Sequence, residues 1–103
     1  MSKWNFRLSE GLTIRQAINN NDNVMVITLL QKVTKKLSTD NRLEEDEQEE
    51  FRGLNELLEG EEQLVVSNED VNSFGWENWE EMINSRLAEF YDLCDRYRIW
   101  IEV

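Results

Sequence analysis

Apolar residues recur at steps of three and four along the last third of the chain, which is the spacing of one helix face. The stripe consists of Trp76, Trp79, Ile83, Leu87, Phe90, Cys94 and Tyr97. Ser73 or Asn72 can cap its beginning. The charges near its two ends complement the helix dipole: Glu77, Glu80 and Glu81 at the start, Arg96 and Arg98 at the end. The pattern predicts a long helix over residues 73–97.

Both ends of the chain have the character of strands. Residues 99–103 are mostly β-branched or aromatic and lack a helical period, whereas Trp4, Phe6 and Leu8 alternate with polar residues. Because a lone strand is unstable, we expect these two segments to pair, which places the chain ends side by side.

The first 40 residues predict two more helices. Thr13 can cap a short one that buries Ile14, Ala17 and Ile18 before the chain breaks at residues 19–23. Asp22 or Asn23 begins the next, which is expected to end near Ser38. Its inward face is predicted to carry Val24, Ile27, Leu30, Val33 or Thr34, and Leu37.

A further helix is expected after Thr39 or Asp40, with Gly60 as its stop. Its apolar stripe is sparse and consists of Leu43, Phe51, Leu54, Leu57 and Leu58. Residues 64–66 form either a third strand or, as we favour, a loop held on the core. The predicted fold is therefore a single α+β domain over residues 1–103, mostly helical, with three to four helices packed on a long C-terminal helix and a small sheet pairing the N- and C-terminal strands.

Charged residues are distributed unevenly along the chain, which is more informative about function than the overall composition. The chain of 103 residues carries a net charge of -11, but residues 1–42 hold seven bases against three acids, and residues 43–103 hold 19 acids against four bases. The densest acidic segment contains Arg52 as its only base. Its carboxylates are Glu44, Glu45, Asp46, Glu47, Glu49, Glu50, Glu56, Glu59, Glu61 and Glu62.

We interpret this segment as a candidate contact surface. Together with a second acidic series on the C-terminal helix, it would present two rows of negative charge, as duplex DNA does at one charge per about 1.7 Å of axis. Such a surface fits the positively charged cleft of a protein that handles nucleic acid. The equal alternative is an ordinary solvated helix face, partly balanced by the basic first third.

The basic cluster Lys32, Lys35 and Lys36 has no arginine or interleaved aromatic residue, and the overall charge opposes nucleic acid. We therefore expect these lysines to pair with the acidic helix, and we expect no direct binding of nucleic acid.

Enzymatic chemistry has little support in the sequence. The absence of histidine excludes serine and cysteine hydrolase dyads and histidine-containing metal sites, and no phosphate-binding loop is present. Acid pairs three residues apart remain as possible Mg²⁺ ligands of the kind found in helical pyrophosphohydrolases similar to MazG. These pairs are Glu47 with Glu50, Glu59 with Glu62, Glu77 with Glu80, and Glu89 with Asp92. In a chain with 22 acids, such spacing also arises by chance. We expect a protein that is not an enzyme and has no cofactor.

Single residues add smaller indications. Cys94 lies on the apolar stripe, where a buried, inert thiol is expected, and one cysteine fits a reducing cytoplasm. No apolar run is long enough to suggest a signal peptide or a membrane span. Trp76 and Trp79 are expected in the core; we expect the core for Trp100 as well, with an exposed binding anchor as the alternative.

Two segments resemble small acidic proteins encoded by phages and mobile elements of Gram-positive bacteria. Near the start these are WNFRLS at residues 4–9 with Gly11 and TIRQAI at 13–18, and near the end they are LAEFYDLCD at 87–95 and RIWI at 98–101. The resemblance implies an inhibitor of host defence, such as an anti-CRISPR or anti-restriction protein that mimics DNA in charge. The expected function is therefore binding of a host DNA- or RNA-binding protein in the bacterial cytoplasm. The alternative is a phage assembly or adaptor protein that acts through an apolar interface, with a homodimer left open.

Overall fold

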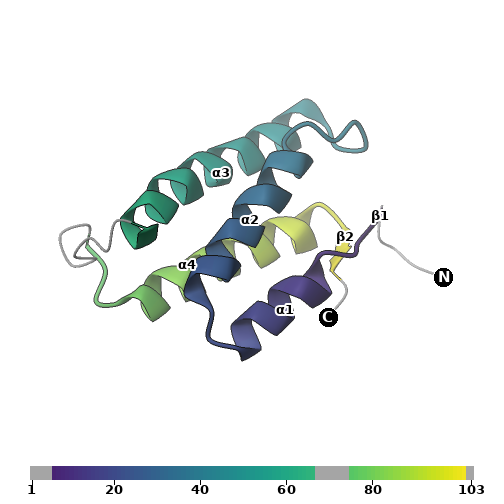
Figure 1. The fold of residues 1–103 in the computed structure, drawn as a ribbon. Helices are drawn as coiled ribbons and strands as arrows, with labels where there is room; N and C mark the ends of the chain where they lie inside the picture. The colour runs from purple at the N-terminus through teal and green to yellow at the C-terminus, as the bar shows by residue number, and fades with distance from the viewer. Residues whose placement is uncertain (1–5, 67–74, 102–103) are drawn as a thin grey trace.

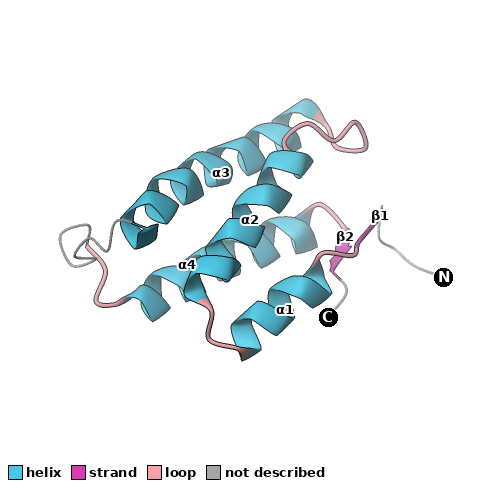
Figure 2. Cartoon of the chain, in the orientation of Figure 1, coloured by secondary structure: helices cyan, strands magenta, loops and turns pink. Residues whose placement is uncertain are grey.

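The computed structural model describes residues 6–66 and 75–101. Along the chain, these form strand β1 (Phe6–Leu8), helices α1 (Gly11–Asn19), α2 (Asn23–Leu37), α3 (Glu45–Val66) and α4 (Trp79–Arg96), and strand β2 (Ile99–Ile101) (Figure 1). Figure 2 shows how little of the described chain is strand. The predicted class, a mostly helical α+β fold with a small sheet from the two chain ends, is confirmed.

Strands β1 and β2 pair in parallel, with Phe6 opposite Ile99 and Leu8 opposite Ile101. Parallel neighbours need a crossover connection, and here all four described helices lie within it. Leu8 and Ile99 are buried, so the sheet closes one end of the helical core. Trp4 and residues 102–103 belong to the predicted strands but lie outside the described residues.

Helix α1 begins at Gly11, two residues before the predicted cap Thr13, which is an exposed helical residue. The break after α1 places Asn21 in the left-handed region, with φ of 54°. Asp22 then caps α2, since its Oδ1 accepts a hydrogen bond from the backbone N–H of Met25. The predicted inward position Val24 is wrong, because its side chain is 47% exposed and Val26 is buried in its place. The other predicted positions of α2 are buried.

Helix α3 corrects four predictions. It begins at Glu45, so neither Thr39 nor Asp40 caps it; the Asp40 carboxylate instead binds the backbone N–H and the guanidinium of Arg42. It runs through Gly60, because a glycine inside a helix costs only about 1 kcal/mol relative to alanine and packing of the helix compensates. Residues 64–66, predicted as a loop, are its last turn. Leu57, predicted to face inward, is half exposed.

Helix α4 starts later than predicted. Asn78 is its cap, accepting a hydrogen bond from the backbone N–H of Glu81, so Trp76 and Glu77 precede the helix. The predicted caps Asn72 and Ser73 lie outside the described residues. After the helix, Arg98 adopts φ of 60° and turns the chain into β2, a place where glycine is more usual.

Helix α2 contacts α1, α3 and α4; in Figure 1 it crosses in front of α4 and runs beside α3. The ring of Phe51 on α3 packs edge-on against Phe90 and Tyr97 of α4, at centroid distances of 6.4 and 6.0 Å. Near its other end, α3 reaches the first half of α4 through Glu61 and Arg86. Helices α3 and α4 are therefore antiparallel, and side chains of the core pack between the faces that they turn inward.

Candidate functional site: an acidic groove between helices α3 and α4

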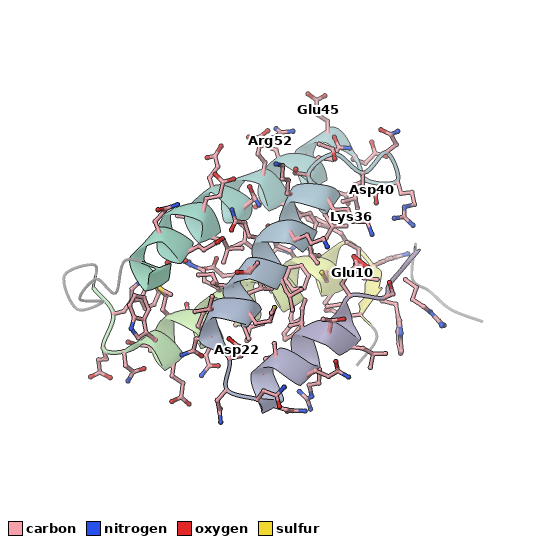
Figure 3. The ribbon with its side chains drawn as sticks, viewed as in Figure 1. Glu10, Asp22, Lys36, Asp40, Glu45 and Arg52 are labelled. Atoms are coloured by element: carbon pink, nitrogen blue, oxygen red, sulfur yellow. The ribbon has the colours of Figure 1, made fainter. Side chains whose placement is uncertain are left out.

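The predicted contact residues follow α3 almost completely. This helix holds nine carboxylates and one base, and Glu44 directly precedes it. Seven of the predicted residues are exposed: Glu44, Glu45, Asp46, Glu49, Glu50, Glu56 and Glu59. Glu47 and Glu62 are half-buried, and a Glu47 side-chain oxygen accepts the backbone N–H of Glu44 at the start of the helix. Figure 3 shows Glu45 directed away from the helix bundle.

Part of this acidic face borders a hollow. The acidic groove, as we name it, is an open depression of about 760 Å³ between α3 and α4. It is lined by Asp46, Glu49, Glu50, Gly53, Leu54 and Leu57 of α3 and by Glu89, Asp92, Leu93 and Arg96 of α4. These positions recur at steps of three and four on each helix, so each helix contributes one face.

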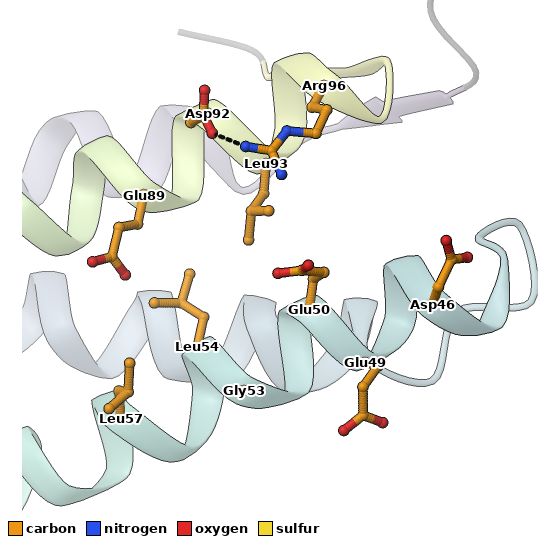
Figure 4. Close-up of a pocket in the computed structure, with 10 residues that line it drawn as sticks. All are labelled: Asp46, Glu49, Glu50, Gly53, Leu54, Leu57, Glu89, Asp92, Leu93 and Arg96. Atoms are coloured by element: carbon orange, nitrogen blue, oxygen red, sulfur yellow. Dashed lines mark hydrogen bonds and ion pairs between the residues drawn. The ribbon is translucent and has the colours of Figure 1, made fainter.

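The groove combines an apolar floor with charged walls. Figure 4 shows Glu50 and Leu54 pointing towards α4, and Glu89 and Leu93 pointing towards α3. Leu54 and Leu93 are almost fully buried, while the Leu57 side chain is half exposed. Five carboxylates and one guanidinium give the lining a net charge of -4.

The carboxylates of the groove differ in how they are compensated. Glu49 pairs with Arg52, Glu89 with Arg86 at 2.8 Å, and Asp92 with Arg96 at 2.6 Å. Asp46 and Glu50 have no ion-pair partner among the described residues. Since they are four residues apart on one helix face, their like charges repel each other.

Glu61, one of the predicted contact residues, is not on the surface. Its carboxylate accepts two hydrogen bonds from Arg86, at 2.7 and 2.8 Å, and only 8% of the residue is exposed. The hydrogen bonds to Glu61 raise the pKa of the Arg86 guanidinium above its ordinary value. The guanidinium also lies 5.2 Å from the centre of a Trp76 ring. Glu61 is therefore committed to an internal pair and does not lie on the surface with the other predicted contact residues.

Arg86 was missed as a structural residue, although a signal was present. Met82 and Phe90, four residues to either side, are fully buried, so Arg86 lies on a buried face of α4. A base at such a position predicts a buried acidic partner, because a charge without one is rarely kept inside. In the sequence, Glu89 and Asp92 belong to an acidic series and form one of the candidate Mg²⁺ pairs. Their position across from α3 depends on how the helices pack.

The basic cluster does not pair with the acidic helix as predicted. Lys36 Nζ binds the Glu10 carboxylate at the start of α1, at 3.1 Å (Figure 3). Lys32 and Lys35 are exposed, and within the described ranges neither forms an ion pair. The three lysines lie on the outer face of α2, away from the acidic groove, whose lining contains no residue of α2.

The remaining candidates divide into core and surface. Cys94 is fully buried as predicted, and burial raises the pKa of its thiol to about 12, which keeps it protonated and inert. Trp76 and Trp79 are partly buried against the core. Trp100 was expected in the core, but it is 43% exposed on β2, because its neighbours Ile99 and Ile101 turn to the other face of the strand.

Across residues 6–66 and 75–101, no group of three or more carboxylate or cysteine side chains is arranged to hold a metal ion. In the same part of the chain, no helix combines the length and apolar character needed to cross a membrane. Comparisons of the chain with protein-family models, with curated protein sequences and with solved structures find no match.

Proposed function

We propose that this protein is a non-catalytic inhibitor, of the phage or mobile-element kind, that binds a bacterial host protein which handles DNA or RNA. The observation that supports the proposal is the concentration of exposed carboxylates on α3 and on the facing side of α4, with few bases among them. This surface would occupy the cationic cleft in which the host protein holds its nucleic acid.

The proposed binding depends on electrostatic attraction between the acidic surface and its partner. A strongly negative surface attracts a cationic cleft over a distance set by the Debye length, about 8 Å at physiological salt. It therefore accelerates association at low salt and loses its effect as salt rises. Since the predicted contact residues other than Glu61 remain on or near the surface, the proposed contact runs along residues 44–50 and 56–62 without Glu61.

The test is capture of a target from nuclease-treated host lysate at low and high salt. We expect a nucleic-acid-handling protein to be recovered at low salt, released at high salt and displaced by duplex DNA. Reversal of Glu50 and Glu56 to lysine is expected to abolish capture. The control reverses Glu80 and Asp95 of α4, which makes the same change in net charge away from the groove. Undiminished capture by the Glu50 and Glu56 variant would refute the proposal.

A second candidate is a phage assembly or adaptor protein, and the exposed Trp100 favours it. An exposed tryptophan is a frequent anchor of protein interfaces. In that case, association with a partner or with a second copy would resist salt, would be lost in Trp100→Ser, and would not respond to reversal of Glu50 and Glu56. These outcomes separate the two candidates.

A further inference from the structure

The acidic groove differs from a plain charged surface because its floor is apolar. Leu54, Leu57 and Leu93 form the floor, and half of the Leu57 side chain remains in contact with solvent. A surface that only imitates a row of phosphates has no use for exposed leucine, since a cationic cleft holds phosphates by charge and hydrogen bonds. The floor therefore indicates a partner with apolar side chains of its own.

The charges lie around this floor on both walls. In the antiparallel arrangement of the helices, Glu89 of α4 lies beside Leu54, whereas Glu50 of α3 lies beside Leu93 (Figure 4). Asp46 extends the acidic wall by one further turn of α3. A ligand that places an apolar side chain on the leucines thus meets a carboxylate on either side, which favours basic residues flanking the apolar ones.

The size and shape of the groove suit a helix. From Asp46 to Leu57, the wall formed by α3 is about 16 Å long, which equals three turns of a helix. Gly53 sits in the middle of this wall, and a Cβ atom at this residue would meet no atom within 4 Å. The wall is therefore open at Gly53, and a partner backbone can approach closely there. The opposite side of the α3 and α4 pair is already packed against α2.

We propose that the acidic groove binds a basic amphipathic helix of the partner protein, with its apolar face on Leu54, Leu57 and Leu93 and its lysine or arginine side chains towards Glu50, Glu89 and Asp46. This inference rests on the proposed function, in which the partner is a cationic protein, and names the part of that partner which the groove accepts. Helix-in-groove recognition of this kind uses apolar anchors at steps of three and four.

The test uses a labelled synthetic peptide of about twelve residues, long enough for three helical turns, with leucine at every third or fourth position and lysine or arginine elsewhere. A scrambled peptide of the same composition has no apolar face. We expect the amphipathic peptide to bind the protein more tightly than the scrambled peptide does, as measured by fluorescence anisotropy. In ¹H–¹⁵N spectra of the protein, the shift changes caused by the amphipathic peptide are expected to centre on Gly53, Leu57 and Leu93. Equal binding of both peptides would show attraction by charge alone and would overturn the proposal.

Two matched pairs of variants locate the site. Leu57→Ser is expected to weaken the amphipathic peptide about fivefold, since half of a leucine side chain is available for burial. Its control, Leu12→Ser, removes an equally exposed leucine from α1. Gly53→Gln places a neutral side chain over the floor and is also expected to weaken binding about fivefold. Its control, Gly60→Gln, makes the same change on α3 where a Cβ atom also meets open space.

Loss of folding cannot produce the expected result, because glutamine favours the helix more than glycine does and both glycine variants should unfold at or above the wild-type temperature. If Leu57→Ser and Gly53→Gln bind like their controls, the groove proposal is wrong. If those variants bind like their controls while reversal of Glu50 and Glu56 still abolishes capture of the host target, only the groove proposal fails and the proposed function stands. If the protein sediments as a dimer in which the backbone amides of Gly53, Leu57 and Leu93 are protected from hydrogen exchange, a second copy occupies the groove. This result would also overturn the proposal.

Discussion

At one end of the α3 and α4 pair, Arg86 and Glu61 are buried together, with 12% and 10% of their side chains exposed. Towards the other end, Arg96 and Asp92 form a pair with 55% and 65% exposed, beside a groove in which Asp46 and Glu50 form no ion pair with any described residue. The same two helices thus enclose charge at one end and present it to solvent at the other. The comparison shows that a carboxylate on α3 is a structural group or a candidate binding group according to what faces it.

The largest effect is expected from Arg86→Ala. Removing this guanidinium leaves the Glu61 carboxylate buried without its partner, so we expect the free energy of unfolding to fall by about 3 kcal/mol. Urea denaturation followed by circular dichroism measures the change. Arg96→Ala is the matched control at the exposed end, where solvent screens the pair and no loss comparable to that of Arg86→Ala is expected. If the two variants lose equal stability, the distinction between a closed end and an open end of the helix pair is wrong.

A smaller effect is expected on the stability of the protein at low pH. The Arg42 guanidinium holds the pKa of the Asp40 carboxyl below its ordinary value of 3.8, so the folded state binds a proton at Asp40 less readily than the unfolded state does. The contribution of this pair is therefore fully present above the unfolded pKa and is lost as pH falls below about 4. Urea denaturation between pH 7 and pH 2 checks this, with Asp40→Asn expected to lose stability less steeply than the wild type.

The control for the acid series is Glu56→Gln, an exposed carboxylate of α3 with no ion-pair partner within the described chain. It removes one surface carboxylate without removing an ion pair, so the comparison separates the effect of the Asp40–Arg42 pair from that of one charge. If the stability of Asp40→Asn falls with pH as steeply as that of the wild type, the Asp40–Arg42 pair does not contribute to acid sensitivity as expected.

The smallest expected effect comes from the repulsion between the like charges of Asp46 and Glu50 in the acidic groove. Replacing Glu50 by glutamine removes its repulsion with Asp46 and is expected to stabilise the protein by about 0.3 kcal/mol at low salt. The gain should disappear at high salt, where charges on the surface are screened. Thermal unfolding at two salt concentrations measures the change. A loss of stability on this substitution would mean that Glu50 has a structural partner.

Several elements were predictable because their causes are local. The apolar stripe of α4 from Trp79 to Cys94, the cap Asp22 and the end of α2 near Ser38 are confirmed, since helix period and capping involve residues only a few positions apart. The pairing of the two end segments was predictable because each needed a partner. Its parallel direction was not, because direction depends on the path of the whole chain between the strands.

The sequence by itself determined the helical class, the exposed acidic character of α3 and the inert, buried position of Cys94, because periodicity and composition suffice for these properties. Only the tertiary structure decided that α3 continues through Gly60 and that Glu61 turns inward to Arg86 while Glu50 faces an open groove. The physical reason is that all carboxylates of α3 are chemically alike along the sequence. The antiparallel packing of α4 places a guanidinium opposite one of them and an apolar floor beside another.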